Sequence, residues 1–179
     1  MANKTLIKNG TLVTATDTFQ ADLLIEGEKI KTIGKEIAEK ADQQFDAKDC
    51  YVFPGGIDAH THLDLPFMGT FSSDDFETGT LAALHGGTTS IIDFAFQSKK
   101  KSLKEGLTTW HEKAKGKAVA DYGFHMAVTD FNSETAKEIK ELIQNEGVTS
   151  FKTFMAYKGA IMIDDKQMID LMNECKKWG

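Results

Sequence analysis

The chain has 179 residues, of which 41% are hydrophobic and 27% are charged, and its formal net charge is −6 at pH 7. This balance is typical of a soluble globular protein, and the length suits one domain or a domain and a half. The acidic charge argues against nucleic acid as the main partner. No stretch approaches the roughly 18 apolar residues of a membrane span, so we also expect no membrane partner.

The N-terminal residues and the cysteines indicate an intracellular setting. Residues 1–4 are not followed by the apolar segment of a signal peptide. Cys50 and Cys175 lie far apart in the sequence and match no metal-binding or redox spacing. We therefore expect two reduced thiols in a cytoplasmic protein. The single basic run, residues 99–101, is interpreted as a solvated loop.

Residues 1–52 are predicted to form β-structure. The expected strands lie at residues 5–8, 11–14, 22–25, 29–33, 44–47 and 51–52. Asn9-Gly10 is predicted to be the tight turn of a hairpin, and residues 26–28 form a second turn. We interpret this part as one sheet of a small antiparallel unit, because a two-layer architecture would need a second sheet.

After Pro54, predicted strands and helices alternate. The expected strands lie at residues 56–60, 88–95, 122–128 and 148–154, and the expected helices at residues 75–84, 102–115, 133–144 and 164–177. Ser73 or Asp74 is expected to cap the first helix, and Ser133-Glu134 the third. Four consecutive βα units imply a parallel sheet with helices packed outside it.

This alternation fits either a doubly wound sheet or part of a barrel. In both folds, sites form at the carboxyl ends of the strands, where this chain places His60, His62 and Asp93. No G-x-G-x-x-G sequence follows the first strand, which disfavours a dinucleotide-binding fold. A complete eight-unit barrel needs roughly 250 residues, so the chain contains about half of one.

The first candidate for chemistry is the pair His60 and His62. Side chains at positions i and i+2 of a strand point to the same face, so two imidazoles there can share one metal ion. The alternative is that each is a polar residue satisfied by its neighbours. His85 and His111 are interpreted as helix-end and surface residues, and His125 lies either at a barrel mouth or in the core.

Lys152 is the second candidate because it interrupts the apolar sequence 151–154. Parallel strands covered on both faces usually read as continuous hydrophobic runs. Burying a lysine in such a strand is costly unless the amine is paired or neutralised. The alternative is a lysine at a strand end that reaches solvent or an acidic neighbour.

Four segments, in order along nearly the whole chain, resemble one enzyme family. Residues 54–62 look like the metal motif of the cyclic amidohydrolases, which many amidohydrolases share. Residues 151–159 resemble the lysine segment of the dihydropyrimidinase and D-hydantoinase family, and residues 74–80 and 86–94 are also similar to that family. The Met-Ala-Tyr sequence at 155–157 narrows the match to hydantoinase-like enzymes.

The resemblance implies an α/β fold. Residues 53–179 would be the first four βα units of a TIM-like (β/α)8 metallo-hydrolase barrel, and residues 1–52 part of a small β-sandwich domain. It further implies that His60 and His62 bind the more buried of two divalent metal ions, usually zinc. Lys152 would carry CO2 as a carbamate and bridge both metals, which would activate a water to attack the ring amide carbon.

The resemblance also implies a substrate pocket. Tyr157 would hydrogen-bond the developing oxyanion, while Leu65, Phe67 and Phe154 would shape the pocket for the exocyclic group of the substrate. The reaction would be reversible hydrolysis of a small cyclic amide, a dihydropyrimidine or a 5-substituted hydantoin, to an N-carbamoyl amino acid, as in pyrimidine catabolism. The full-length protein would be a homotetramer.

Members of this family are more than twice as long as the chain. Two further histidines and an aspartate of their metal site lie in later strands, so we expect the chain alone to be inactive. One alternative is another cyclic amidohydrolase, such as allantoinase or dihydroorotase, against which Tyr157 argues. Another is a non-catalytic dihydropyrimidinase-like assembly protein, against which His60, His62 and Lys152 argue. A third is a bare fragment whose exposed barrel edges associate with other chains.

Overall fold

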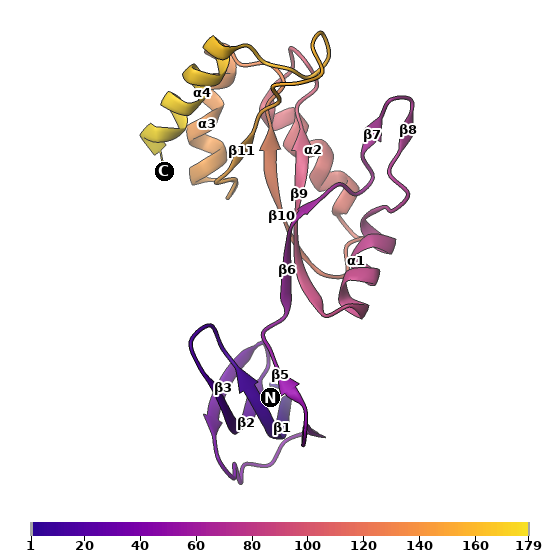
Figure 1. Ribbon diagram of the computed structural model, residues 1–179, viewed down its shortest axis with the longest axis vertical. Helices are drawn as coiled ribbons and strands as arrows, with labels where there is room; N and C mark the ends of the chain where they lie inside the picture. The colour runs from indigo at the N-terminus through magenta and orange to yellow at the C-terminus, as the bar shows by residue number, and fades with distance from the viewer. Residues whose placement is uncertain (1, 179) are drawn as a thin grey trace. The chain divides into compact units, whose positions relative to one another are not determined.

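The computed structural model describes residues 2–178 (Figure 1). The chain divides after Pro54 into two compact units, residues 1–54 and 55–179. None of the helices described between residues 2 and 178 has the length and hydrophobicity of a membrane-spanning segment.

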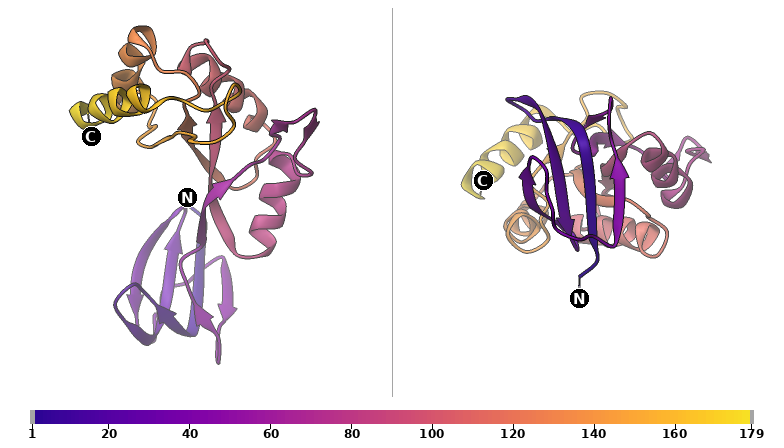
Figure 2. Two further views of the ribbon diagram at one scale, coloured as in Figure 1. Left: turned by 45° about the horizontal axis from the view of Figure 1, so that its top comes forward. Right: turned by 90° about the horizontal axis from the view of Figure 1, so that it is seen from below.

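The N-terminal unit is one mixed sheet (Figure 2). Its strands are β1 (Lys4–Val13), β2 (Thr18–Glu26), β3 (Lys29–Gly34), β4 (Gln43–Asp46) and β5 (Tyr51–Val52). The order is β3-β2-β1-β4, and β5 also pairs with β1. β2 is antiparallel to both its neighbours, whereas β4 and β5 run parallel to β1. The expectation of a purely antiparallel sheet is therefore wrong, because residues 35–42 cross the sheet before β4 begins.

Asn9-Gly10 is a β-bulge within β1 rather than the predicted hairpin turn. Asn9 has a left-handed backbone with φ 63°, and the pairing of β1 with β2 shifts register between Ile7 and Gly10. The Asn9 N–H leaves the strand ladder and donates to the buried Asp22 carboxylate at 2.9 Å. The strand therefore continues past the dipeptide to Val13, and the chain reverses in residues 14–17 instead.

A small apolar cluster is buried on one face of the N-terminal sheet. Leu12, Ala21 and Leu23 form this cluster, with Ile7 and Val52 packed against it. Leu6 and Leu24 are also buried, outside this cluster, whereas several large hydrophobic side chains of residues 2–54 are exposed, namely Phe19, Ile30, Ile33, Phe45, Tyr51 and Phe53. Residues 2–54 thus contain a single sheet with no second layer, as expected for part of a β-sandwich.

The second unit contains a parallel sheet and four helices. Its sheet strands are β6 (Gly56–Thr61), β9 (Thr88–Phe96), β10 (Asp121–Ala127) and β11 (Phe151–Lys152), and its helices are α1 (Phe76–His85), α2 (Leu103–Ala114), α3 (Ser133–Gln144) and α4 (Asp165–Trp178). A short antiparallel hairpin, β7 (Pro66–Phe67) and β8 (Thr70–Phe71), which the sequence did not predict, joins β6 to α1.

The strand order distinguishes the barrel from the doubly wound alternative. The order β6-β9-β10-β11 follows the chain without reversal, and every pair is parallel. Consecutive helices contact one another, α1 with α2, α2 with α3 and α3 with α4. A doubly wound sheet would reverse its order and divide the helices between two faces. The expected α/β fold, the first four βα units of a TIM-like barrel, is therefore confirmed (Figure 1).

The fourth strand is much shorter than predicted. Only Phe151 and Lys152 pair with β10, rather than residues 148–154. Within residues 2–178, β11 has a neighbour on one side only, so little holds its flanks in extended form. Lys152 therefore ends a two-residue strand, and the chain turns away directly after it.

Two helices begin with capping boxes, and their cap residues differ from those that the sequence predicted. Asp75, not Ser73 or Asp74, caps α1, and the Asp75 N–H donates in turn to the Thr78 hydroxyl. Asn132, not Ser133, caps α3 in the same way. In both helices, threonine stands at the third helical position in place of the usual Glu or Gln. A search for the usual capping-box sequence therefore does not find these two caps.

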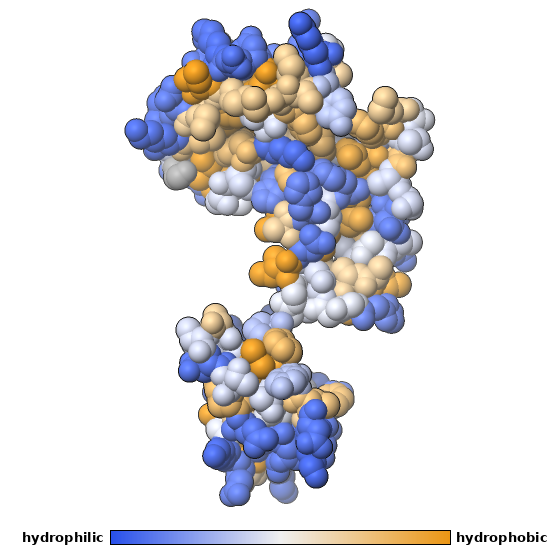
Figure 3. All heavy atoms as spheres, viewed as in Figure 1, coloured by the Kyte–Doolittle hydropathy of each residue, from blue (hydrophilic) through white to orange (hydrophobic). Residues whose placement is uncertain are grey.

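The core of the second unit lies between the sheet and its helices. It is built from residues of all four helices and of the strands β9 and β10, among them Phe76, Ile91, Leu107, Met126, Ile139 and Leu171. Figure 3 shows that hydrophobic and polar residues are interspersed on one face of the molecule. Exposed hydrophobic residues of this unit include Met68, Met155 and Met172.

Candidate metal centre

His60 and His62 lie together at the carboxyl end of β6. Their ring centroids are 5.2 Å apart, as the i, i+2 spacing predicts. Both rings pack on Phe94 of β9, with centroid distances of 4.6 Å for His60 and 4.9 Å for His62. The two imidazoles thus share one side of the strand end and rest on one aromatic ring.

Lys152 reaches the same aromatic ring from β11. Its Nζ atom lies 4.2 Å from the centroid of Phe94 and 5.1 Å from that of Phe154. The side chain is half-buried, and no carboxylate among residues 2–178 forms an ion pair with it. Lys152 does end its strand and is partly exposed, as the alternative expected, but the acidic neighbour that this alternative also allowed is not found among residues 2–178. Phe94 brings together the three residues that the sequence singled out separately.

The chemistry of these side chains fits a divalent metal. The Nδ1 atom of His62 is buried and has no hydrogen-bond partner among residues 2–178. Burial lowers the pKa of His62, and the nearby Lys152 and His60 lower it further, so the ring is held in the neutral form that binds metals. No three His, Cys, Asp or Glu side chains of residues 2–178 converge on one point. The described residues therefore offer two imidazoles and one amine, which is part of a metal shell.

His125 lies beside this cluster but both of its ring nitrogens are occupied. Its ring is 4.7 Å from that of Phe94. Nε2 lies 3.0 Å from the Ala59 carbonyl oxygen, and Nδ1 pairs with the Ser150 hydroxyl. A carbonyl only accepts, so Nε2 carries a hydrogen, and in the neutral ring Nδ1 accepts from the Ser150 hydroxyl. His125 thus ties β10 to Ala59 of β6 and to Ser150, the residue before β11, and has no nitrogen free for a metal.

A pocket of about 310 Å³ opens next to the two candidate ligands His62 and Lys152. Its lining consists of His62, Leu65, Phe67, Phe96, Lys152, Phe154, Tyr157 and Ile161. All four residues that the sequence assigned to the pocket line it. The sequence analysis missed Phe96 and Ile161. Phe96 lies two residues after Phe94 in β9, so the two side chains point to the same face of the strand. The lining is mostly apolar, with His62, Lys152 and Tyr157 as its polar side chains, which is the usual composition of a small-molecule site.

Tyr157 stands in a strained turn at the pocket edge. Its φ is 63°, a left-handed conformation that is uncommon for a tyrosine, and its side chain is 53% exposed. Its carbonyl accepts from the N–H groups of Ala160 at 3.0 Å and Met162 at 3.3 Å. Lys99, from the predicted solvated run, donates to the Ala160 carbonyl at 3.0 Å. These bonds hold the loop in the shape that presents Tyr157 to the Phe67 ring, 5.8 Å away.

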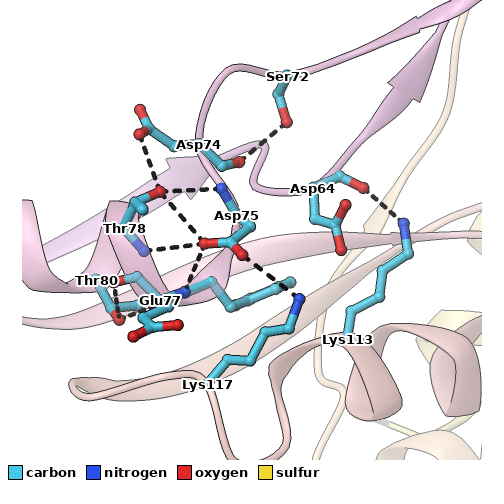
Figure 4. Close-up of polar contacts among 10 residues, drawn as sticks. Asp64, Ser72, Asp74, Asp75, Glu77, Thr78, Thr80, Lys113 and Lys117 are labelled. Carbon is cyan, nitrogen blue, oxygen red and sulfur yellow. Dashed lines mark hydrogen bonds and ion pairs between the residues drawn. The ribbon is translucent and has the colours of Figure 1, made fainter.

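The hairpin β7–β8 presents Leu65 and Phe67 to the pocket. Its base is closed by bonds from Asp64 N to the Asp74 carbonyl at 2.8 Å and between Leu65 and Ser72. Two lysines contact this base, Lys113 of α2 and Lys117 just beyond it, as Figure 4 shows. Lys113 Nζ donates to the Asp64 carbonyl at 2.6 Å, and Lys117 Nζ lies 3.4 Å from the Asp75 carboxylate.

Known proteins with similar sequences are amidohydrolases, D-hydantoinases and dihydropyrimidinases. Residues 51–179 match the family model described as "Amidohydrolase family". The chain is 52% identical over 174 residues to a D-hydantoinase of Geobacillus stearothermophilus, covering 97% of this chain and 37% of that protein. It is 44% identical to a dihydropyrimidinase of Rattus norvegicus, covering 97% of this chain and 34% of that one.

Solved structures agree with the sequence comparison. The crystal structure of dihydropyrimidinase from Brevibacillus agri superposes with a TM-score of 0.96 at 52% identity, covering 98% of this chain and 38% of that one. The chain thus spans little more than a third of the length of the relatives it matches. The resemblance noted in the sequence, to the dihydropyrimidinases and D-hydantoinases within the amidohydrolases, is confirmed.

Proposed function

The chain belongs to the amidohydrolase family, and on that premise we propose that the protein carrying it is a metal-dependent cyclic amidase. Its substrates would be dihydropyrimidines or 5-substituted hydantoins, which it would open to N-carbamoyl amino acids. The observation that carries the proposal is the convergence of His60, His62 and Lys152 on Phe94, beside an apolar pocket. The D-hydantoinase and dihydropyrimidinase names of its relatives give the substrate class.

The three side chains around Phe94 would hold the metal centre. His60 and His62 would each give one neutral imidazole to a divalent ion, which we propose to be zinc. The Lys152 ammonium would lose one proton, and the free amine would add CO2 and release a second proton to form the carbamate, so that a cation becomes an anionic oxygen ligand. Two divalent metals, when bound, supply Lewis acidity and an activated water. The remaining ligands would come from outside residues 2–178, because no third His, Cys, Asp or Glu side chain of these residues joins His60 and His62 at the site.

The pocket residues would orient the substrate relative to that centre. Leu65, Phe67 and Phe154 would contact the exocyclic group and exclude water from it. The Tyr157 hydroxyl would donate to the oxygen that becomes negative when the ring amide is attacked. The left-handed turn at Tyr157 and the bonds to its carbonyl would keep this donor in place.

The apolar lining separates this proposal from its enzymatic alternatives. An allantoinase or a dihydroorotase must bind a strongly polar ureido group or a carboxylate on its substrate. Hydrophobic side chains form most of this pocket, and Lys152, the lysine in its lining, would be an anionic carbamate that offers no cation to a carboxylate. The histidines and the lysine likewise distinguish the chain from an assembly protein that has lost its ligands. We further propose that the whole protein is cytoplasmic and a homotetramer.

Ring-opening assays test the proposed function. The complete protein carrying this chain is offered dihydrouracil and a hydantoin with an apolar 5-substituent, before and after removal of metal by a chelator. We expect turnover of both, loss on chelation and recovery with zinc, whereas His62→Ala stays inactive under all conditions. Turnover that survives chelation, or zinc-loaded protein that opens neither ring, would contradict the proposal. The 179-residue chain alone should show no turnover above a zinc-only control.

A further inference from the structure

The ladder between β6 and β9 is irregular where the candidate ligands stand. Asp58 pairs with Ile91 and Thr61 pairs with Asp93, so Ala59 and His60 together stand opposite one residue of β9. The His60 N–H donates instead to the Asp58 carboxylate at 3.1 Å. Such bulges re-aim side chains but remove backbone bonds that would fix the strand. Another group must therefore hold the end of β6.

The Asp93 carboxylate supplies the missing bonds. Its Oδ2 atom accepts from the Thr61 hydroxyl and from the Leu63 N–H, each at 2.8 Å. Its other oxygen accepts from the N–H of Phe94 at 2.7 Å. The two donors to Oδ2 flank His62 in the chain. Asp93 is 0% exposed, so these bonds form away from water.

A buried carboxylate at this place is costly unless it is fully hydrogen-bonded. Two of its three bonds go to the segment that carries His62, and bonds to a charged acceptor are stronger than neutral ones. Phe94, the next residue along β9, supports both imidazole rings. One short piece of β9 thus fixes the backbone of the histidine segment and the position of its rings.

We propose that Asp93 is a positioning residue for the candidate metal centre. It would not touch the metal but would hold residues 61–63 on β9, so that His60 and His62 are arranged before a metal binds. This inference rests on the proposed function, since it assigns a role toward the same site. Groups that orient metal ligands typically change metal affinity by about 10- to 100-fold when removed.

Asp22 offers a matched control. It is also a buried carboxylate, 4% exposed, and it accepts from two backbone N–H groups, those of Asn9 at 2.9 Å and Ile37 at 3.0 Å. It belongs to the N-terminal unit, outside the unit that carries the histidines. Removing either carboxylate should cost stability, but removing Asp22 should leave metal affinity unchanged.

The test measures zinc affinity by competition with a chromophoric chelator in the complete protein, for wild type, Asp93→Ala, Asp93→Asn and Asp22→Ala. Hydrogen exchange of residues 61–63, followed by mass spectrometry, gives a readout independent of activity. We expect Asp93→Ala to bind zinc about 10- to 100-fold more weakly and to exchange faster at residues 61–63. Asp93→Asn, which keeps one acceptor oxygen, should lie between it and wild type.

Each outcome decides the inference. Zinc affinity of Asp93→Ala within about twofold of wild type would overturn it, as would an equal loss in Asp22→Ala. If Asp93→Ala does not fold, Asp93→Asn decides by the same threshold. A wild-type protein that binds no zinc would overturn the proposed function itself, and the inference with it. Wild-type binding with unchanged affinity in the Asp93 variants would overturn the inference alone.

Discussion

The hairpin β7–β8 can be loosened by a single substitution at its base. Lys113 Nζ donates to the Asp64 carbonyl at 2.6 Å and lies 4.5 Å from the centroid of the Trp110 ring. Lys113→Met keeps a flexible side chain of similar length on Trp110 but removes the donor and the charge. The hairpin then depends on its own bonds, such as that from Asp64 N to the Asp74 carbonyl.

The magnitude follows from the two lost interactions. A hydrogen bond from a charged donor contributes about 1.5–3 kcal/mol when buried, and a cation–π contact at an exposed site about 0.5–1 kcal/mol. Lys113 is half-buried, and methionine recovers part of the contact with Trp110. We therefore take the lower end, about 1.5 kcal/mol, which corresponds to roughly tenfold in the opening equilibrium of the hairpin.

Hydrogen exchange measures this opening directly. The amides of Asp64 and Ser72, which bond within the hairpin base, should exchange roughly tenfold faster in Lys113→Met than in wild type. Lys115→Met, at an exposed lysine just beyond α2, is the control and should leave both amides unchanged. Equal exchange in wild type and Lys113→Met, or equal acceleration in the control, would refute the role of Lys113.

Three further results are expected. Helix capping holds the pKa of the Asp75 carboxyl below its usual value, so the charged carboxylate stabilises the fold above pH 4, and this contribution is lost as the pH falls through the lowered pKa. Asp75→Asn should therefore lower the melting temperature less at about pH 3 than at neutral pH. An equal drop at both pH values would contradict this. Glu138 of α3 accepts from the first N–H groups of α2, so Glu138→Ala should lower the free energy of unfolding by about 1–2 kcal/mol in urea titrations, and no change would count against it. Burial raises the pKa of the Cys175 thiol whereas Cys50 is exposed, so iodoacetamide should label Cys50 first at pH 8, and the reverse order would be inconsistent with the fold.

Local periodicity was sufficient to predict most elements of the fold. The βα alternation after Pro54 gave all four sheet strands and all four helices, because each depends on its own apolar pattern and caps. It failed where a partner distant in sequence decides the conformation. Asn9-Gly10 has the composition of a hairpin turn, but the Asp22 carboxylate captures the Asn9 N–H and makes it a bulge. The strands β7 and β8 have only two residues each, which is too short to show the alternation of apolar and polar residues that predicts a strand.

The candidate site was predictable in part for the same reason. The i, i+2 spacing brought His60 and His62 together, and the misplaced charge of Lys152 marked it as unusual. Phe94 and Asp93 could not be assigned, because their roles depend on the register of β9 against β6, which includes a bulge. The alternation of residues in a sequence shows which side chains share a face of a strand, but it does not show which residues of the neighbouring strand lie opposite them.

The central claim is that His60, His62 and Lys152 hold divalent metal together. The most direct measurement is the zinc content of the complete protein after dialysis, compared between wild type and Lys152→Ala by mass spectrometry of the metal. The account predicts two zinc ions per chain in wild type and a clear loss in Lys152→Ala, with an unchanged far-UV circular dichroism spectrum. Equal zinc content in the two folded proteins, or none in wild type supplied with zinc and CO2, would contradict it.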